Sequence, residues 1–306
     1  MNIYSAAGYL GVPLFIILSG VLLLDPGKAD ESLTVFFKKR ASRIAAPFVF
    51  WTVAYFAWAH YMHGLQLTAA NIFSGLINGS YYHLWFIYLL IGLYCVTPVL
   101  RIIVKYITPQ KFLFFLAIWF AGTVLEPFML IFLPNVGFNP VMFVFTGWAG
   151  TFVLGVYLLK NPARPRTLYP YLIAGLSVAV IADGVAPLFA GAGALGFFHG
   201  YLSFNIIIAS AALFLILAAV PATRLQSGNP YVNRAVNWVG KNSLGIYLVH
   251  IVVLETIEYG YLGLKINMST LSPIVEIPLI TALTLVATCA LIYGLKKIPY
   301  VDRILG

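Results

Sequence analysis

Residues 7–24 read AGYLGVPLFIILSGVLLL, a stretch without a charged side chain. A helix rises about 1.5 Å per residue, so a run of roughly 20 apolar residues crosses the hydrocarbon core of a bilayer. The rest of the chain has the same character. Of its 306 residues, 61% are hydrophobic and only 9% are charged, whereas soluble domains carry about 25% charged residues. The composition therefore predicts an all-α, polytopic integral membrane helix bundle.

Charged residues gather in short segments that separate long uncharged ones. No Lys, Arg, Asp or Glu lies between Arg43 and Arg101, and two later gaps of similar length hold one acidic residue each. Each gap has room for two spanning helices and a short turn, so we predict about nine spans in one domain that covers residues 1–306. The predicted spans lie near residues 7–24, 44–63, 82–103, 112–133, 140–159, 168–188, 201–221, 241–262 and 273–295.

The distribution of basic residues sets the orientation, because positive charge concentrates in cytoplasmic loops. If the first span runs from outside to inside, all of the 18 Lys and Arg residues except Lys265 lie in the cytoplasm. The N-terminus is therefore predicted outside and the C-terminus in the cytoplasm. The longest inner loops are 25–43 and 222–240, and Asn229-Pro230 indicates a turn in the second. Since the net charge of +9 is spread over such loops, it indicates membrane lipid as a partner and not nucleic acid.

Two arginines lie where the first inner loop enters the second span. Arg40 and Arg43 are three residues apart and share one helical face, next to Lys39. Guanidinium groups bind phosphate through paired hydrogen bonds, which makes a phosphorylated cytoplasmic donor a candidate ligand. A basic cluster that only anchors the helix at the membrane surface is the alternative.

Ionisable side chains inside spans are costly and are therefore functional candidates. His250 lies about 11–15 Å into the bilayer if its helix starts near Asn242. A structural hydrogen bond and a catalytic role fit this position equally well. His83 opens the third span among aromatic residues, where hydrogen bonding at headgroup level is the alternative to a functional role.

The remaining ionisable groups are few. Acidic residues in the outer halves of spans are Glu126, Asp183, Glu255 and Glu258. Histidines interpreted as headgroup-level residues at outer span ends are His60, His63 and His199. No histidine spacing matches a metal-binding motif, so no metal site is predicted.

Four blocks of the chain carry a resemblance to a known family. Residues 11–20 read GVPLFIILSG, residues 36–47 read FFKKRASRIAAP, residues 83–98 read HLWFIYLLIGLYCVTP and residues 243–250 read SLGIYLVH. In this order and spacing they resemble the signatures of the membrane acyltransferase-3 family. The similarity runs over essentially the whole chain and looks most like the single-domain members.

The resemblance implies a membrane enzyme that moves an acyl group, usually acetyl, from cytoplasmic acyl-CoA to a hydroxyl group. The acceptor would be a saccharide or a related molecule of the cell envelope, and the location the bacterial inner membrane. Acyl-CoA would be a co-substrate, with no cofactor held permanently. The resemblance also implies that Arg40, Arg43 and Lys39 bind the CoA side.

The resemblance indicates the catalytic residues less directly. His83 and His250 are the candidates in this chain, and we expect them to line the cavity rather than to replace the family's usual catalytic base. The other residues expected to line it or to contact the substrate are Trp85, Tyr88, Tyr247, Ser243, Glu126 and Asp183.

One departure from the family concerns the start of the chain. The family begins with a further helix that carries an Arg and an essential His, whereas this sequence starts just before the second family helix. Adding that helix would give about ten spans with both termini inside. We expect the activity of the chain as given to depend on this helix. A transporter or flippase for a saccharide or small metabolite, and a non-catalytic fragment, are the alternatives to the enzyme.

Overall fold

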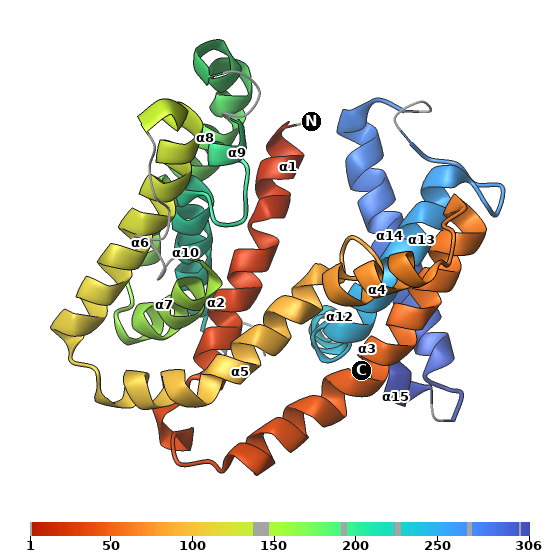
Figure 1. Cartoon of the computed structure of the whole chain (residues 1–306), viewed down its shortest axis with the longest axis horizontal. Coiled ribbons are helices and arrows are strands. Elements are labelled where there is room, and N and C mark those ends of the chain that lie inside the picture. Colours follow the sequence, from red (N-terminus) through yellow and green to blue (C-terminus); the bar gives the residue numbers. More distant parts are fainter. Residues whose placement is uncertain are drawn as a thin grey trace. The chain divides into compact units, whose positions relative to one another are not determined.

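The computed structural model describes residues 2–136, 147–190, 195–221, 223, 228–267, 271–299 and 301–306. Within these ranges the regular structure is entirely helical, which confirms the predicted fold class. The chain forms two compact units, each built from two separate segments (Figure 1). Unit 1 comprises Met1–Asp30 and Val96–Arg224, and unit 2 comprises Glu31–Cys95 and Leu225–Gly306.

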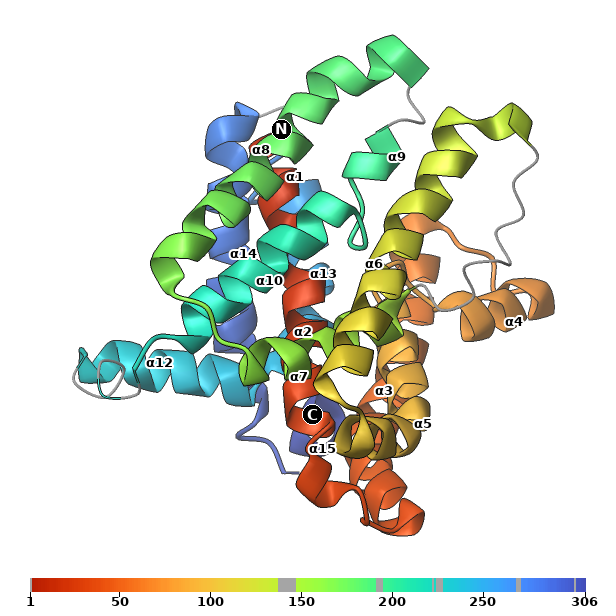
Figure 2. The ribbon, with the colours of Figure 1, turned by 90° about the vertical axis from the view of Figure 1, so that its left-hand side faces the viewer.

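Unit 1 is a bundle in which α2, α7, α8 and α10 pack on one another. Helices α8 and α10 lie side by side (Figure 2). A core of Ile17, Leu168 and Leu215 joins α2, α8 and α10. The helices of this unit are α1 (Asn2–Tyr9), α2 (Gly11–Leu23), the part of α5 (Trp85–Tyr106) from Val96 on, α6 (Pro109–Phe132), α7 (Trp148–Lys160), α8 (Pro165–Ala190), α9 (Leu195–Phe198) and α10 (Phe204–Ala218), with the short 3₁₀ turns η1 (Pro26–Lys28) and η2 (Pro134–Val136).

Glycines allow α2 and α7 to approach closely. A Cβ atom on Gly20 would overlap the carbonyl oxygen of Phe152, and one on Gly155 would overlap that of Ile17. Both clashes are with backbone, which cannot move aside as a side chain can. Small residues serve this purpose at membrane helix interfaces, where packing replaces the hydrophobic effect as the main attraction.

Replacing Gly20 by alanine is expected to destabilise the protein by about 1–3 kcal/mol, because the added methyl group forces α2 away from α7. Gly11→Ala in the same helix is the matched control, since no atom of the described residues lies within 4 Å of its Cβ position. That change is expected to be neutral or stabilising by roughly 0.5–1 kcal/mol. Unfolding of both variants in detergent measures the difference, and equal stabilities would contradict the close packing.

Unit 2 is built around the long helix α3 (Leu33–His63) and the pair α13 (Ser243–Tyr259) and α14 (Pro273–Leu295), which pack along each other (Figure 1). Its core contains Tyr55 of α3, with Leu84 and Leu248. The Trp51 indole N–H donates to the Ile304 carbonyl at 2.9 Å and ties α15 (Asp302–Leu305) to α3. The other elements are α4 (Ala69–Asn78), the part of α5 up to Cys95, and α12 (Pro230–Lys241).

Every predicted span overlaps a helix. Among the described residues, five helical segments are long and apolar enough to cross a membrane: Tyr4–Leu23, Trp85–Tyr106, Pro109–Phe132, Pro165–Ala182 and Pro273–Leu295. Helices α7 and α10 are apolar but shorter, and the part of the predicted span 140–159 before residue 147 lies outside the described residues. The protein is therefore a multi-pass membrane protein.

The two segments predicted as inner loops contain helix instead. Helix α3 begins within 25–43, at Leu33, where the Ser32 hydroxyl accepts a hydrogen bond from the Val35 N–H at 3.4 Å. The Asn229-Pro230 pair starts α12 and does not form an isolated turn. The Asn229 side chain accepts from the Tyr231 N–H at 2.9 Å, and proline is well suited to the first helical position, where no N–H is needed.

Candidate active site

Two histidines that lie far apart in the sequence meet in unit 2. His83 precedes α5 and His250 lies on α13. Their ring centroids are 5.6 Å apart and the rings are nearly perpendicular, at 82°. His83 is buried, with 7% of its surface exposed, and His250 is half-buried. The structure thus brings together the two imidazoles that the sequence singled out.

Tyrosine rings surround His83. The ring centroids of Tyr55, Tyr247, Tyr82 and Tyr81 lie 4.7, 5.4, 5.8 and 6.0 Å from that of His83. Among the described residues, neither ring nitrogen of His83 has a hydrogen-bond partner. A neutral imidazole offers one N–H donor and one lone pair. Buried polar atoms without partners are rare, so both nitrogens of this ring have unused hydrogen-bonding capacity.

The tautomer of His250 follows from its hydrogen bond. Its Nδ1 atom lies 2.7 Å from the Tyr247 carbonyl oxygen. A carbonyl only accepts, so Nδ1 carries the proton, and in the neutral ring Nε2 carries the lone pair. The Tyr247 hydroxyl in turn donates to the backbone carbonyl of His83, which ties α13 to the segment before α5. His250 is therefore an oriented base beside His83.

A carboxylate lies further along α13 in the same unit. Glu255 is buried and accepts hydrogen bonds from Trp58 Nε1 at 2.7 Å, from His63 Nε2 at 3.0 Å and from the Tyr81 hydroxyl at 2.6 Å. Burial and the hydrogen bond to Glu255 raise the pKa of the Tyr81 phenol, so it stays protonated and donates. From the sequence alone, we interpret His63 as a headgroup-level residue. No local signal links it to Glu255, because the partners come from different helices.

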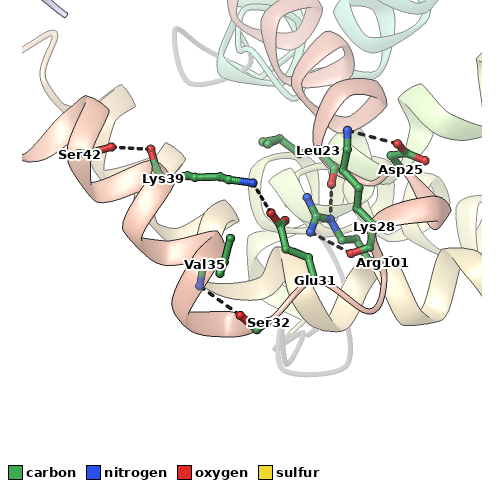
Figure 3. A network of polar contacts seen from close by, with 9 residues as sticks. All are labelled: Leu23, Asp25, Lys28, Glu31, Ser32, Val35, Lys39, Ser42 and Arg101. Carbon is green, nitrogen blue, oxygen red and sulfur yellow. Dashed lines mark hydrogen bonds and ion pairs between the residues drawn. The ribbon is translucent and has the colours of Figure 1, made fainter.

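The three basic residues predicted to bind the CoA side differ in their surroundings. Lys39 Nζ lies 2.8 Å from Glu31 Oε1 (Figure 3). The Arg40 guanidinium lies over the rings of Phe36 and Tyr94, 5.2 and 5.9 Å from their centroids. Arg43 is exposed. Glu31 already neutralises Lys39, so of these three residues the two arginines remain able to meet an anion.

Comparison with known protein families places these features in context. A family model described as an acyltransferase domain matches residues 1–293, nearly the whole chain. The chain belongs to the acyltransferase-3 family. No curated protein and no solved structure matches it. The family and the apolar helices together identify a membrane acyltransferase, and the resemblance predicted from the four sequence blocks is confirmed.

The other residues predicted for the acyltransferase site fall in different places. The Tyr88 hydroxyl donates to the Leu76 carbonyl on α4 at 2.6 Å, and Trp85 begins α5. Ser243 is exposed at the first position of α13, about 10 Å along the helix from His250, so it does not join the histidine pair. No group of three or more His, Cys, Asp or Glu side chains in the described ranges is placed to hold a metal ion.

Glu126 and Asp183 belong to unit 1 of the acyltransferase. Glu126 of α6 lines a cavity of about 310 Å³, together with Thr123, Ser203 and Phe204. Asp183 lies on α8, and its side chain lies outside the described ones.

Arg101 has a structural role that sequence reasoning missed. We predicted it to be one of the cytoplasmic charges that set the topology, yet only 1% of its surface is exposed. Its Nε donates to the Leu23 carbonyl at 2.6 Å and a terminal nitrogen donates to the Lys28 carbonyl at 3.2 Å (Figure 3). The last carbonyls of a helix lack intrahelical partners. Arg101 thus closes the end of α2.

Proposed function

We propose that this membrane acyltransferase moves an acyl group, in the first instance acetyl, from cytoplasmic acyl-CoA to a hydroxyl group of a cell-envelope saccharide. The enzyme would lie in a bacterial inner membrane, with about nine spans, an outer N-terminus and a cytoplasmic C-terminus. The observation that carries the proposal is the pair of imidazoles. One is an oriented base, and the other is a buried ring that makes no hydrogen bond within the described part of the chain.

The two rings have complementary tasks in this reaction. His250 Nε2 takes the proton of the acceptor hydroxyl, and the oxygen attacks the thioester carbonyl carbon. The N–H of His83 stabilises the negative charge that develops on the carbonyl oxygen. The carbon–sulfur bond then breaks, and the CoA thiolate leaves with the proton from His250. Atoms and charges balance, and no permanently bound cofactor takes part.

Helix α3 runs from the arginines proposed to bind acyl-CoA toward the histidine pair. Its early part carries Arg40 and Arg43. Tyr55, whose ring contacts His83, lies about 18–22 Å further along the helix. CoA carries its phosphates at one end of a long arm and the thioester at the other. Phosphates at the arginines therefore leave the arm free to run along α3 toward the imidazoles.

Replacing Arg43 by glutamine is expected to raise the KM for acyl-CoA about tenfold, because a charge-assisted hydrogen bond contributes roughly 1.5–3 kcal/mol. Arg40→Gln should act in the same direction. Lys38→Gln removes an exposed charge from the same turn and is the matched control, with an expected change below twofold. Initial rates at varied acyl-CoA concentration measure the effect. Equal KM values for all three variants would assign the arginines to membrane anchoring.

The function itself is tested with isotope-labelled acetyl-CoA and membranes from cells with and without the gene. The expected result is label in ester linkage on an envelope glycan only where the full chain is made. No difference in any acylated glycan would contradict the proposal. Saccharide uptake by proteoliposomes without acyl-CoA would favour a transporter instead.

A further inference from the structure

The Glu255 carboxylate joins two parts of unit 2. Its three donors are Trp58 and His63 of α3 and Tyr81 in the segment between α4 and α5. The Tyr81 hydroxyl lies within hydrogen-bond distance of both carboxylate oxygens, at 2.6 and 2.8 Å. Glu255 therefore connects α13, on which it lies, with α3 and with the segment that carries His83.

A carboxylate suits this place for a chemical reason. When ionised it accepts hydrogen bonds at both oxygens and donates none, so an indole N–H, an imidazole N–H and a phenol can all point at it. A glutamine amide would turn an N–H toward one of these donors. The side chain of Glu255 is also largely shielded, with 8% of its surface exposed, so water cannot readily replace a lost partner.

Tyr81 links Glu255 to the segment that contains His83. It lies two residues before His83, and its carbonyl accepts from the Leu84 N–H at 3.0 Å, which closes a turn over 81–84. The Tyr81 ring stacks on Tyr55 at 4.9 Å and 25°, and Tyr55 contacts the His83 ring. Since the His83 ring makes no hydrogen bond with any residue that the structure describes, its orientation depends on this turn and on the rings around it.

We propose that Glu255 is a positioning residue for acyl transfer: through the Tyr81 hydroxyl it fixes the turn 81–84 and so holds His83 against His250. The inference rests on the proposed function, since it assigns Glu255 to the same reaction. Glu255 does not touch the reacting atoms. It acts through Tyr81 on the orientation of the ring that stabilises the oxyanion.

The decisive variant is Tyr81→Phe, which removes the hydroxyl and keeps the ring that stacks on Tyr55. We expect kcat to fall about 10- to 100-fold, with the KM for acyl-CoA unchanged, because small displacements of catalytic groups cost about 10²-fold. Glu255→Gln should show the same pattern with a larger loss. Glu258→Gln, a half-buried glutamate on the same helix, is the matched control and should keep the wild-type rate. Unchanged kcat in Tyr81→Phe would overturn the proposal.

A second readout does not require activity. Diethyl pyrocarbonate modifies accessible histidines, and mass spectrometry locates the product in the purified full chain. We expect His83 to react slowly in the wild type and several-fold faster in Tyr81→Phe, with exposed His60 as the internal reference. Equal labelling of His83 in both proteins would contradict the proposed positioning role of Glu255 and Tyr81. If the wild type transfers no acyl group but the labelling differs as expected, the proposed function fails and the anchoring of the turn stands.

Discussion

Replacing His250 by asparagine is expected to lower the rate of acyl transfer by about 10²- to 10⁴-fold, the usual contribution of a general base. The asparagine amide N–H can replace Nδ1–H as donor to the Tyr247 carbonyl, so the structural hydrogen bond survives. The Nε2 lone pair is lost. The variant therefore separates the two roles that the sequence left open, because a residue needed only for its hydrogen bond would tolerate the change.

The matched control for this experiment is His60→Asn. His60 makes the same type of hydrogen bond, from Nδ1 to the Leu65 carbonyl at 2.7 Å, but it is exposed at the end of α3. We expect it to keep full activity. Initial rates with labelled acyl-CoA, and helix content by circular dichroism, are measured for both proteins. A folded His250→Asn protein that retains more than about a tenth of the wild-type rate would exclude general base catalysis by His250.

Much of the helical architecture could be predicted from charge and hydropathy. The charge-free stretch from Ile44 to Leu100 predicts two spans, and the structure has helix in both, in α3 and α5. Helix α14 begins and ends at the predicted residues 273 and 295. These features depend on the free-energy cost of placing charged side chains and unpaired backbone polar groups in lipid. The positions of charged and apolar residues in the sequence are enough to reveal them.

Contacts between distant segments could not be predicted in the same way. The sequence blocks named His83 and His250 as catalytic candidates, but only the packing of α13 beside the turn at 81–84 sets their separation. Glu255 is the clearer case. Its donors come from two other segments, and nothing in the residues around Trp58, His63 or Tyr81 indicates a common acceptor.

Helix α12 shows a third kind of limit. Its mixture of polar and apolar residues resembles a loop when hydropathy is averaged. At helical spacing, however, Val232, Val236 and Val239 share one side, while Arg234, Asn237 and Lys241 lie on the other. The alternation of apolar and polar residues at helical spacing, and not the average hydropathy, is the signal that predicts this helix.

Arg101 is a residue whose hydrogen-bond partners its charge does not reveal, and its replacement by methionine is expected to destabilise the protein by about 3 kcal/mol. Methionine fills much of the same space but cannot donate, so the Leu23 and Lys28 carbonyls lose their charged donor. A hydrogen bond to a charged group contributes roughly 1.5–3 kcal/mol. Part of the combined loss from the two hydrogen bonds is offset, because the variant no longer has to bury a charged guanidinium. Unfolding of the purified protein in mixed micelles measures the loss.

Lys105→Gln is the matched control, because Lys105 lies one turn further along α5 and also contacts the segment after α2. Its Nζ lies 2.9 Å from Asp30 Oδ2, and the Asp30 side chain is 88% exposed. Exposed ion pairs contribute at most about 1 kcal/mol. We therefore expect Arg101→Met to unfold well before Lys105→Gln. If both variants lose the same small amount, Arg101 acts as a surface charge that sets topology, and the hydrogen bonds to the end of α2 contribute nothing to stability.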